Sequence, residues 1–182
     1  MAKLVSTTYG EALFELAVEE NKVDVFAEEI ASVRDILAQN VDFSKFMNHP
    51  RILKEEKIQV LENVFKGRIS DELTGFLTLL VTKDRYGDIQ AILDYFIGEV
   101  KKYKGIGIAY VTTTEVLNDS QKAQIERRLL ETASYQQMEM HYSQDESLIG
   151  GMVVKIGDRV VDSSIKTKLN DLQRQLLKIQ LS

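Results

Sequence analysis

The chain has 182 residues, of which 44% are hydrophobic, and it contains no cysteine. This composition is typical of a globular protein with a buried core, and the missing cysteines exclude disulfide bonds and thiolate metal sites. A net charge of −5 argues against a general nucleic-acid-binding function, which needs clustered basic residues. No stretch reaches the roughly 20 apolar residues of a transmembrane helix, so we expect no direct insertion into a membrane.

The first hundred residues have an almost continuous helical period. The segment from Ser6 to Glu20 has an apolar arc that is wider than one contact in a small bundle requires. This helix is either the centre of the bundle or the carrier of a second apolar face for a partner helix. The next apolar stripe predicts a helix that ends near Asn40, and it comprises Val23, Phe26, Ile30, Val33 and Leu37.

Two more helices are predicted between residues 50 and 82. Pro50 is the only proline of the chain, and proline fits the first turn of a helix because its missing amide would have no partner there. We therefore predict a helix from Pro50 to Phe65. The next helix begins at Ser70, and its body from Leu73 to Val81 is nearly all apolar. Such a segment must be covered on more than one side, either by the protein's own core or by a partner.

The helical period of the apolar residues ends after Lys104, and a strand-like pattern follows. We place the boundary between two domains there. Residues 1–104 are predicted to form a bundle of five or six helices, and residues 105–182 a small α+β domain with the order β-α-β-β-α. Its first strand spans Ile106 to Val116. Asn118 and Gln121 have the spacing of a capping box at the start of the following helix. The predicted fold class is therefore mainly α, with an α+β domain at the C-terminal end.

The stretch from Leu148 to Leu177 predicts a β-hairpin joined to an amphipathic helix. Gly150 and Gly151 suit a bulge or the close approach of another backbone. Gly157 and Asp158 form a two-residue connection between two β-rich runs, as hairpins use.

Polar residues after this hairpin predict the start of the last helix. Asp162 and Ser163, with the serine that follows, offer side-chain oxygens to the free backbone amides of a helix start. The helix then carries an apolar stripe with spacings of four and three residues, which comprises Ile165, Leu169, Leu172, Leu176 and Ile179.

The sequence has no recognisable catalytic or cofactor site. It lacks the Gly-x-x-x-x-Gly-Lys-Ser/Thr phosphate loop, and His49 and His141 stand in no metal-ligand spacing. The nearest approach to an acid–base cluster is His141 with Asp145, but the acidic residues there fit a solvated turn. We therefore expect a protein that is not an enzyme and that has no cofactor or metal. A small hydrolase using His141 and Asp145 is the least favoured alternative.

Several parts of the sequence resemble the family of the bacterial ATP synthase delta subunit, whose mitochondrial relative is the oligomycin-sensitivity-conferring protein. The specific match is the run from Leu148 to Asp158, continued by Val161 to Ile165 and by Leu169. The more general matches, at the first, fourth and fifth helices of the family, are Tyr9 to Phe14, Asn48 to Pro50 with Lys57, and Lys83 to Arg85. Gly10 departs from the alanine or other good helix former that is usual in the family.

The resemblance implies a stator component, with one copy in each complex. In this family the N-terminal bundle grips the N-terminal helices of the alpha subunits on the catalytic head. The C-terminal domain meets the C-terminal end of subunit b in the peripheral stalk. The protein would lie at the cytoplasmic face of the cell membrane, as a peripheral part of the complex, and resist rotor torque during proton-driven ATP synthesis. The alternative is a non-catalytic adaptor of another assembly.

The resemblance also assigns roles to particular residues. For the alpha subunit we expect a groove between the first and fifth helices, whose candidate residues are Tyr9, Leu13, Leu16, Phe76, Leu79, Leu80 and Lys83. For subunit b the candidates are the exposed face of the last helix and the hairpin. The family signature has a structural role in this interpretation, shaping the hairpin and joining it to its helix, and comprises Gly150, Gly151, Gly157, Asp158, Asp162 and Ser163.

Overall fold

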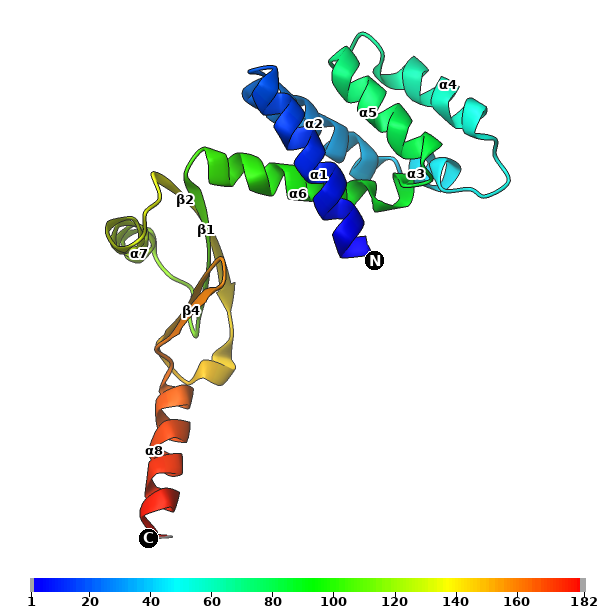
Figure 1. Cartoon of the computed structure of the whole chain (residues 1–182). Coiled ribbons are helices and arrows are strands. Elements are labelled where there is room, and N and C mark those ends of the chain that lie inside the picture. The colour runs from blue at the N-terminus through cyan, green and yellow to red at the C-terminus, as the bar shows by residue number, and fades with distance from the viewer. Residues whose placement is uncertain (1, 181–182) are drawn as a thin grey trace. The chain divides into compact units, whose positions relative to one another are not determined.

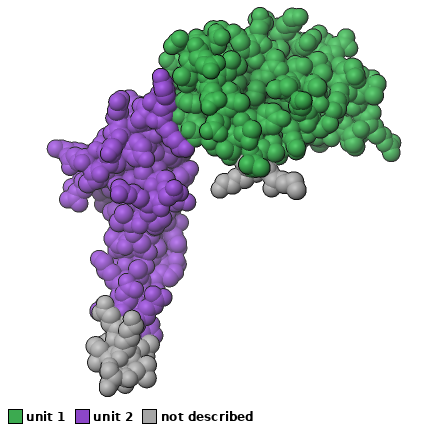
Figure 2. Space-filling model, viewed as in Figure 1, with its two compact units in different colours: residues 1–100 green, residues 101–182 purple. Residues whose placement is uncertain are grey.

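A computed structural model describes residues 2–180 of the chain, with side chains described for residues 4–174. The chain divides into two compact units, residues 1–100 and 101–182 (Figure 2). Helix α6 (Ile89–Tyr103) runs through this division, and the boundary expected after Lys104 stays a prediction. Within residues 2–180, no helix combines the length and the apolar character that crossing a membrane requires.

Unit 1 is helical and has one hydrophobic core (Figure 1). Its elements are α1 (Ala2–Glu19), α2 (Val23–Gln39), α3 (Val41–Met47), α4 (Lys54–Phe65), α5 (Asp71–Thr82), the short 3₁₀ helix η1 (Tyr86–Asp88) and most of α6. Every one of these elements contributes buried side chains to the core. Its largest fully buried members include Phe26, Phe96, Leu13, Ile30 and Met47. The predicted helical bundle is confirmed.

Gly10 lets α1 pack directly against α6. A Cβ atom at this position would lie 2.5 Å from Cδ1 of Tyr95 and 3.1 Å from the carbonyl oxygen of Ile92. A larger residue would therefore force the Tyr95 ring to move. Glycine lowers the intrinsic stability of a helix by about 1 kcal/mol relative to alanine. The close contact between the two helices therefore gives a structural reason for glycine at this position.

The predicted helix start at Pro50 is wrong, because α4 begins at Lys54. The amide of Ile52 donates a hydrogen bond to the carbonyl oxygen of His49 at 3.4 Å, and the amide of Arg51 donates to Nδ1 of His49 at 3.2 Å. Pro50 therefore occupies the second position of a tight turn, where its fixed φ angle fits equally well.

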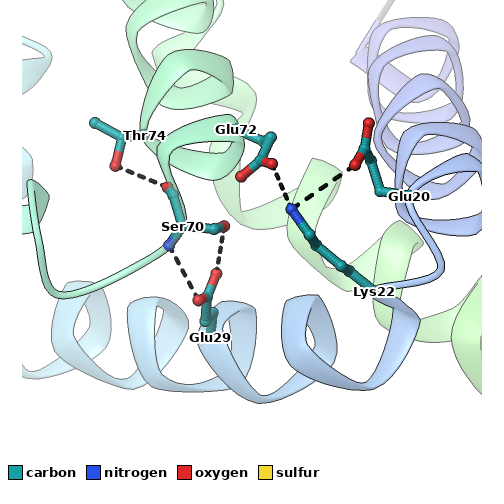
Figure 3. A network of polar contacts seen from close by, with 6 residues as sticks. All are labelled: Glu20, Lys22, Glu29, Ser70, Glu72 and Thr74. Carbon is teal, nitrogen blue, oxygen red and sulfur yellow. Dashed lines mark hydrogen bonds and ion pairs between the residues drawn. The ribbon is translucent and has the colours of Figure 1, made fainter.

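Polar contacts connect the beginning of α5 to the beginning of α2 (Figure 3). The ammonium group of Lys22 forms ion pairs with Glu72 in the first turn of α5 and with Glu20. Its hydrogen bond to Glu72 holds the pKa of that carboxyl below its usual value. Glu29 of α2 binds Ser70, the residue that precedes α5. These contacts fix the start of α5 on the bundle.

Unit 2 is built on a mixed sheet with the strand order β2-β1-β3-β4. The strands are β1 (Ile106–Thr113), β2 (Gln137–Gln144), β3 (Met152–Ile156) and β4 (Arg159–Asp162). Strand β1 runs parallel to β2 and antiparallel to β3, which forms the predicted hairpin with β4. The first strand ends at Thr113 instead of Val116, because the Thr113 hydroxyl donates to the carbonyl oxygen of Glu115 at 2.7 Å and the chain turns there.

The helices of unit 2 complete the predicted order β-α-β-β-α. They are α7 (Asp119–Thr132) and α8 (Ile165–Gln180), with the short 3₁₀ helix η2 (Glu146–Leu148) before β3. The capping box at the start of α7 is confirmed. The amide of Gln121 donates to Oδ1 of Asn118 at 2.8 Å, and the amide of Asn118 donates to Oε1 of Gln121 at 3.0 Å. Both contacts are local in sequence, which is why the pattern predicted them.

Helix α7 covers one face of the sheet beside β2 (Figure 1). The Tyr142 hydroxyl donates to the carbonyl oxygen of Lys122 at 3.4 Å, and the ammonium group of Lys122 lies 5.5 Å from the centre of the Tyr142 ring. The strand register places Tyr142 on the same face as Val111 and Val154. This face is therefore the inner face of unit 2.

Candidate partner-binding surfaces

The face of unit 1 that was expected to bind a partner belongs partly to the core. Leu13, Phe76 and Leu80 are buried among the other apolar side chains of the bundle. These three side chains are therefore not open to water in this structure, and their part in a partner-binding groove stays a prediction. Leu80 follows Leu73 and Leu77 at helical spacing, so all three point inward from α5.

The accessible part of this face lies around Leu79 on α5. Leu79 is 42% exposed, and Lys83 at the end of the helix is exposed as well. Gly75 lies one turn before Leu79 and is also exposed. A Cβ atom on Gly75 would meet nothing within 4 Å, so nothing inside unit 1 requires a glycine there. The exposed side of α5 therefore carries a glycine, one large apolar side chain and a lysine.

The structure of α1 is consistent with both roles considered for this helix, a place in the core of the bundle and an apolar face for a partner helix. Leu13 and Ala17 are buried, so the helix packs into the core by one stripe. Tyr9 and Leu16 are half-buried and contact the edge of that core. Leu4, near the start of the helix, is largely exposed. Helix α1 therefore combines a buried stripe with an accessible apolar margin.

Helix α8 of unit 2 exposes its apolar stripe. Ile165, Leu169 and Leu172 are between 43 and 54% exposed. The helix contacts η2 and extends away from the hairpin (Figure 1). The predicted stripe continues at Leu176 and Ile179, whose side chains lie outside the described residues. An amphipathic helix with its apolar side open to water is a typical site for a partner.

An apolar groove of about 950 Å³ lies between α7 and the hairpin on the inner face of unit 2. It is open because α7 packs beside β2 and leaves β3 and β4 uncovered. Its wall consists of Leu129, Thr132, Ala133, Ser134, Tyr135, Val154, Ile156, Arg159, Val160 and Val161. The hairpin is a predicted candidate surface, whereas the contribution of α7 was not predicted. The sequence gives no signal for it, because a half-buried Leu129 looks like any core residue.

The core of unit 2 is small for its length. Among its described residues, the buried hydrophobic side chains are Ala109, Val111, Leu148 and Val154. None of the side chains of α7 is fully buried. A unit that buries so little apolar surface gains little stability from its own packing. The stripe of α8 and the groove are therefore apolar surfaces whose burial by a partner would stabilise the unit.

The signature glycines join the hairpin to α8. The amide and the hydroxyl of Ser163 both donate to the carbonyl oxygen of Met152, at 3.0 and 2.9 Å. The amide of Ile165 donates to the carbonyl oxygen of Gly150 at 2.9 Å. Gly151 has a φ of +80°, and a Cβ atom there would lie 2.5 Å from the carbonyl oxygen of Ser163. The predicted close approach of another backbone is present, and it takes place between these residues.

Asp162 organises the first turn of α8. Its carboxylate accepts hydrogen bonds from the amide of Ser164 at 2.9 Å and from the hydroxyl of Thr167 at 2.7 Å. These hydrogen bonds, with that of the Ser164 amide first, hold the pKa of Asp162 below its usual value. The Ser164 hydroxyl oxygen accepts from the amide of Thr167 at 3.2 Å, as an N-cap does.

The turn of the hairpin follows the predicted two-residue pattern. Gly157 has a φ of +54°, and Asp158 completes the connection between the paired residues Ile156 and Arg159. Among the signature residues, Gly157 and Asp158 thus form the turn, whereas Gly150, Gly151, Asp162 and Ser163 have the backbone or capping contacts described above.

The candidate acid–base residues are not brought together. His141 stacks on Tyr110 with ring centres 4.9 Å apart, and its Nε2 atom lies 3.0 Å from Glu139. Lys101 also binds Glu139 and holds the pKa of its carboxyl below the usual value. Asp145 instead accepts a hydrogen bond from the amide of Ser147 at the start of η2. Among the described residues, no group of three or more histidine and carboxylate side chains has an arrangement suited to a metal ion.

Comparison with known proteins gives consistent matches over nearly the whole chain. A family model described as "ATP synthase delta (OSCP) subunit" matches residues 5–176. The ATP synthase subunit delta of Lachnoclostridium phytofermentans is 52% identical over 181 residues, with 100% of each chain covered. That of Alkaliphilus metalliredigens is 35% identical over 181 residues, which cover 98% of this chain and 99% of that protein.

The fold has a counterpart among solved structures. A chain in the cryo-EM structure of the Toxoplasma gondii mitochondrial ATP synthase hexamer matches with a TM-score of 0.75 at 23% identity. The match covers 94% of this chain and 97% of that chain. It shows the fold, and the family rests on the sequence matches above. Because these matches span nearly the whole chain, the chain belongs to the ATP synthase delta (OSCP) subunit family.

Proposed function

We propose that the chain is a stator subunit of a proton-translocating ATP synthase and has no catalytic activity of its own. It would connect the catalytic head to the peripheral stalk, in one copy, at the cytoplasmic face of the cell membrane. Catalysis would belong to other subunits, and this chain would resist the torque of the rotor. The observation that carries the proposal is that each of the two units has its own accessible apolar surface.

Unit 1 would bind the N-terminal helices of the alpha subunits through the outer side of α5 and the margin of α1. Exposed Leu79 offers an apolar contact, and exposed Gly75 lets the backbone of a partner helix approach closely. Lys83 lies at the end of this surface and would favour an acidic residue on the partner. Tyr9 and Leu16 would extend the contact on α1. Leu13, Phe76 and Leu80 would support this surface from inside the core.

Unit 2 would bind the C-terminal end of subunit b. The stripe of Ile165, Leu169 and Leu172 on α8 would form one part of the contact, and the groove beside the hairpin the other. Three basic residues flank this stripe: Lys166, Lys168 and Arg174. Asp171 is the one acidic residue of α8 among those whose side chains are described, so an acidic partner helix would be favoured. Burial of these apolar surfaces would add the packing that unit 2 lacks by itself.

Add-back of the subunit to ATP synthase that lacks it tests the proposal. Wild-type chain should restore proton-driven ATP synthesis, because rotor torque drives synthesis only when the catalytic head is kept from turning with the rotor. Leu172→Asp should restore much less synthesis, while ATP hydrolysis by the head continues. Gln173→Asp adds the same charge to the next exposed position of α8 and should behave like the wild type. Equal activity of the two variants would argue against a stalk contact through the stripe, and failure of the wild type would overturn the stator function.

A further inference from the structure

Strand β4 is open to water on both of its faces. Its four residues, from Arg159 to Asp162, are all exposed, and Val160 and Val161 are 58 and 65% exposed. The register with β3 places Val161 on the inner face of the sheet and Val160 on the outer face. A helix laid against one face would leave the valine of the other face in water. A strand beside β4 would contact both valines.

The backbone of β4 has a free edge, because β4 stands at the end of the described sheet. The amide of Ser163 donates to the carbonyl oxygen of Met152, so these residues are a hydrogen-bonded pair that extends the ladder with β3. Such pairs alternate along an antiparallel ladder, so the backbone groups of Val160 and Asp162 point away from β3. Among the described residues, the amides of both and the carbonyl oxygen of Val160 have no hydrogen-bond partner.

The apolar groove on the inner face extends to this free edge. Val160 belongs to the wall of the groove although its side chain lies on the outer face, so its backbone borders the groove. A helix satisfies its own backbone groups, so a helix that covered this edge would bury the free groups of β4 without partners. Each such group costs free energy comparable to a lost hydrogen bond. An extended segment would instead pair with them.

The wall of the groove also indicates the charge of an occupant. Among the described residues that form this wall, Arg159 alone is charged. Its side chain is exposed, and within the described part of the chain its guanidinium group forms no ion pair. A carboxylate on the occupant would therefore have one specific partner at this end of β4.

We propose that an extended segment of a partner chain adds to β4 as an additional, antiparallel strand of the sheet. The segment has an apolar residue opposite Val161, an acidic residue opposite Arg159 and, between them, a residue that covers Val160. Antiparallel pairing is slightly more stable per residue than parallel pairing. The inference rests on the proposed function for the source of the segment, because the groove is assigned above to the stalk. It adds the conformation of the segment and the position of its acid.

The designed peptide acetyl-Ser-Val-Thr-Val-Val-Glu-Ser-amide tests strand addition on the full chain. In antiparallel pairing its fourth, fifth and sixth residues lie opposite Val161, Val160 and Arg159. Hydrogen exchange followed by nuclear magnetic resonance should show rapid exchange of the Val160 and Asp162 amides in the free chain and slower exchange with the peptide. The Val161 amide faces β3 and should be protected in both states. Protection of the Val160 and Asp162 amides in the free chain would overturn the proposal.

N-methyl groups on the peptide separate strand addition from apolar contact alone. Methylation of the third and fifth amides removes the donors that face β4 and should weaken binding about tenfold or more, as expected for two lost hydrogen bonds. Methylation of the fourth and sixth amides, which face away from β4, is the matched control and should leave the affinity nearly unchanged. Equal affinities of the two methylated peptides would refute strand addition, as would no binding of the unmodified peptide at about 1 mM.

Arg159→Gln tests the position of the acid. Exchange of the glutamate of the peptide for glutamine should weaken binding to the wild type about threefold, as for an exposed ion pair, and should have no effect on binding to Arg159→Gln. Lys155→Gln removes the same charge from the outer face of the same hairpin and should keep the threefold difference. An effect of the glutamate that persists in Arg159→Gln would place its partner elsewhere and overturn this assignment.

Val160→Pro removes the outward amide of β4 and leaves the ladder with β3 intact, as proline can on an edge strand. In the add-back assay described above it should restore less ATP synthesis than the wild type. Full synthesis with this variant would mean that the stalk does not use the edge. If the wild type restores synthesis but the peptide results fail, only strand addition is overturned. Failure of the wild type would instead overturn the stator function and leave the peptide results valid. A wild-type dimer in sedimentation that Val160→Pro abolishes would make a second copy the occupant and overturn the proposal.

Discussion

The carboxylate of Glu29 on α2 accepts hydrogen bonds from both the backbone amide and the hydroxyl of Ser70, at 3.0 and 2.6 Å (Figure 3). Ser70 precedes α5, and its own side chain caps no amide of that helix. A residue 41 positions earlier in the chain therefore fixes the start of α5. Because α5 carries Leu79, this contact also positions the surface proposed to bind the catalytic head.

Glu29→Ala should destabilise unit 1 by about 1–2 kcal/mol, because it leaves two part-buried donors of Ser70 without their charged acceptor. Urea unfolding followed by circular dichroism at 222 nm measures the change. Glu28→Ala removes the same charge from an exposed neighbouring position and should change stability by less than about 0.5 kcal/mol. Similar losses for the two variants would mean that charge, and not the contact with Ser70, matters.

Gly151→Ala should destabilise unit 2 more than Gly157→Ala does. Both glycines have a positive φ, which costs an alanine roughly 1 kcal/mol. At Gly157 this is the whole effect, since a Cβ atom would meet nothing within 4 Å. At Gly151 the Cβ atom would also collide with the backbone of Ser163, so the hairpin must separate from α8. Hydrogen exchange of the Ser163 and Ile165 amides measures this separation, and equal protection in the two variants would contradict it.

The stability of unit 2 should depend on the ionisation of Asp162. Its folded-state pKa is lowered from 3.8 by hydrogen bonds to Ser164 and Thr167. The carboxylate therefore contributes stability above pH 3.8, and the contribution is lost as the pH falls through the lower, folded-state pKa. Wild type should exceed Asp162→Asn in stability at neutral pH, and the difference should shrink below pH 3.8.

Unfolding curves between pH 2 and 7 measure this difference. Asp158→Asn is a matched control, because Asp158 carries the same charge in the exposed turn of the same hairpin. A difference between wild type and Asp162→Asn that stays constant over this pH range would contradict a role for the charge.

The sequence predicted well those features that depend on neighbours in the chain. The capping box of Asn118, the hairpin turn at Gly157 and the N-cap at Ser164 are all local, so residue type and spacing determine them. The start of α4 was missed because proline fits a turn and a helix start equally well. Distinguishing Leu79 from Leu80 requires the packing of α5 against other helices, because both lie in one apolar run. The groove of unit 2 depends on where α7 lies on the sheet, which periodicity does not encode.

Leu79→Asp and Leu80→Asp should separate binding from folding. Leu79 is 42% exposed and Leu80 is fully buried, although they are neighbours on α5. Leu79→Asp should leave the helical circular dichroism intact, because the new carboxylate stays in water. It should weaken binding of a peptide with the alpha-subunit N-terminal sequence at least tenfold, since a charge would face an apolar partner.

Leu80→Asp should instead unfold unit 1, because an unpaired charge would be buried in its core. Titration of the full chain with the peptide, followed by calorimetry, measures binding, and a thermal scan of each variant measures folding. If Leu79→Asp binds the peptide like the wild type, the contact lies elsewhere than on the outer side of α5. If it unfolds, Leu79 belongs to the core, and the head must contact α1 or another exposed face of unit 1.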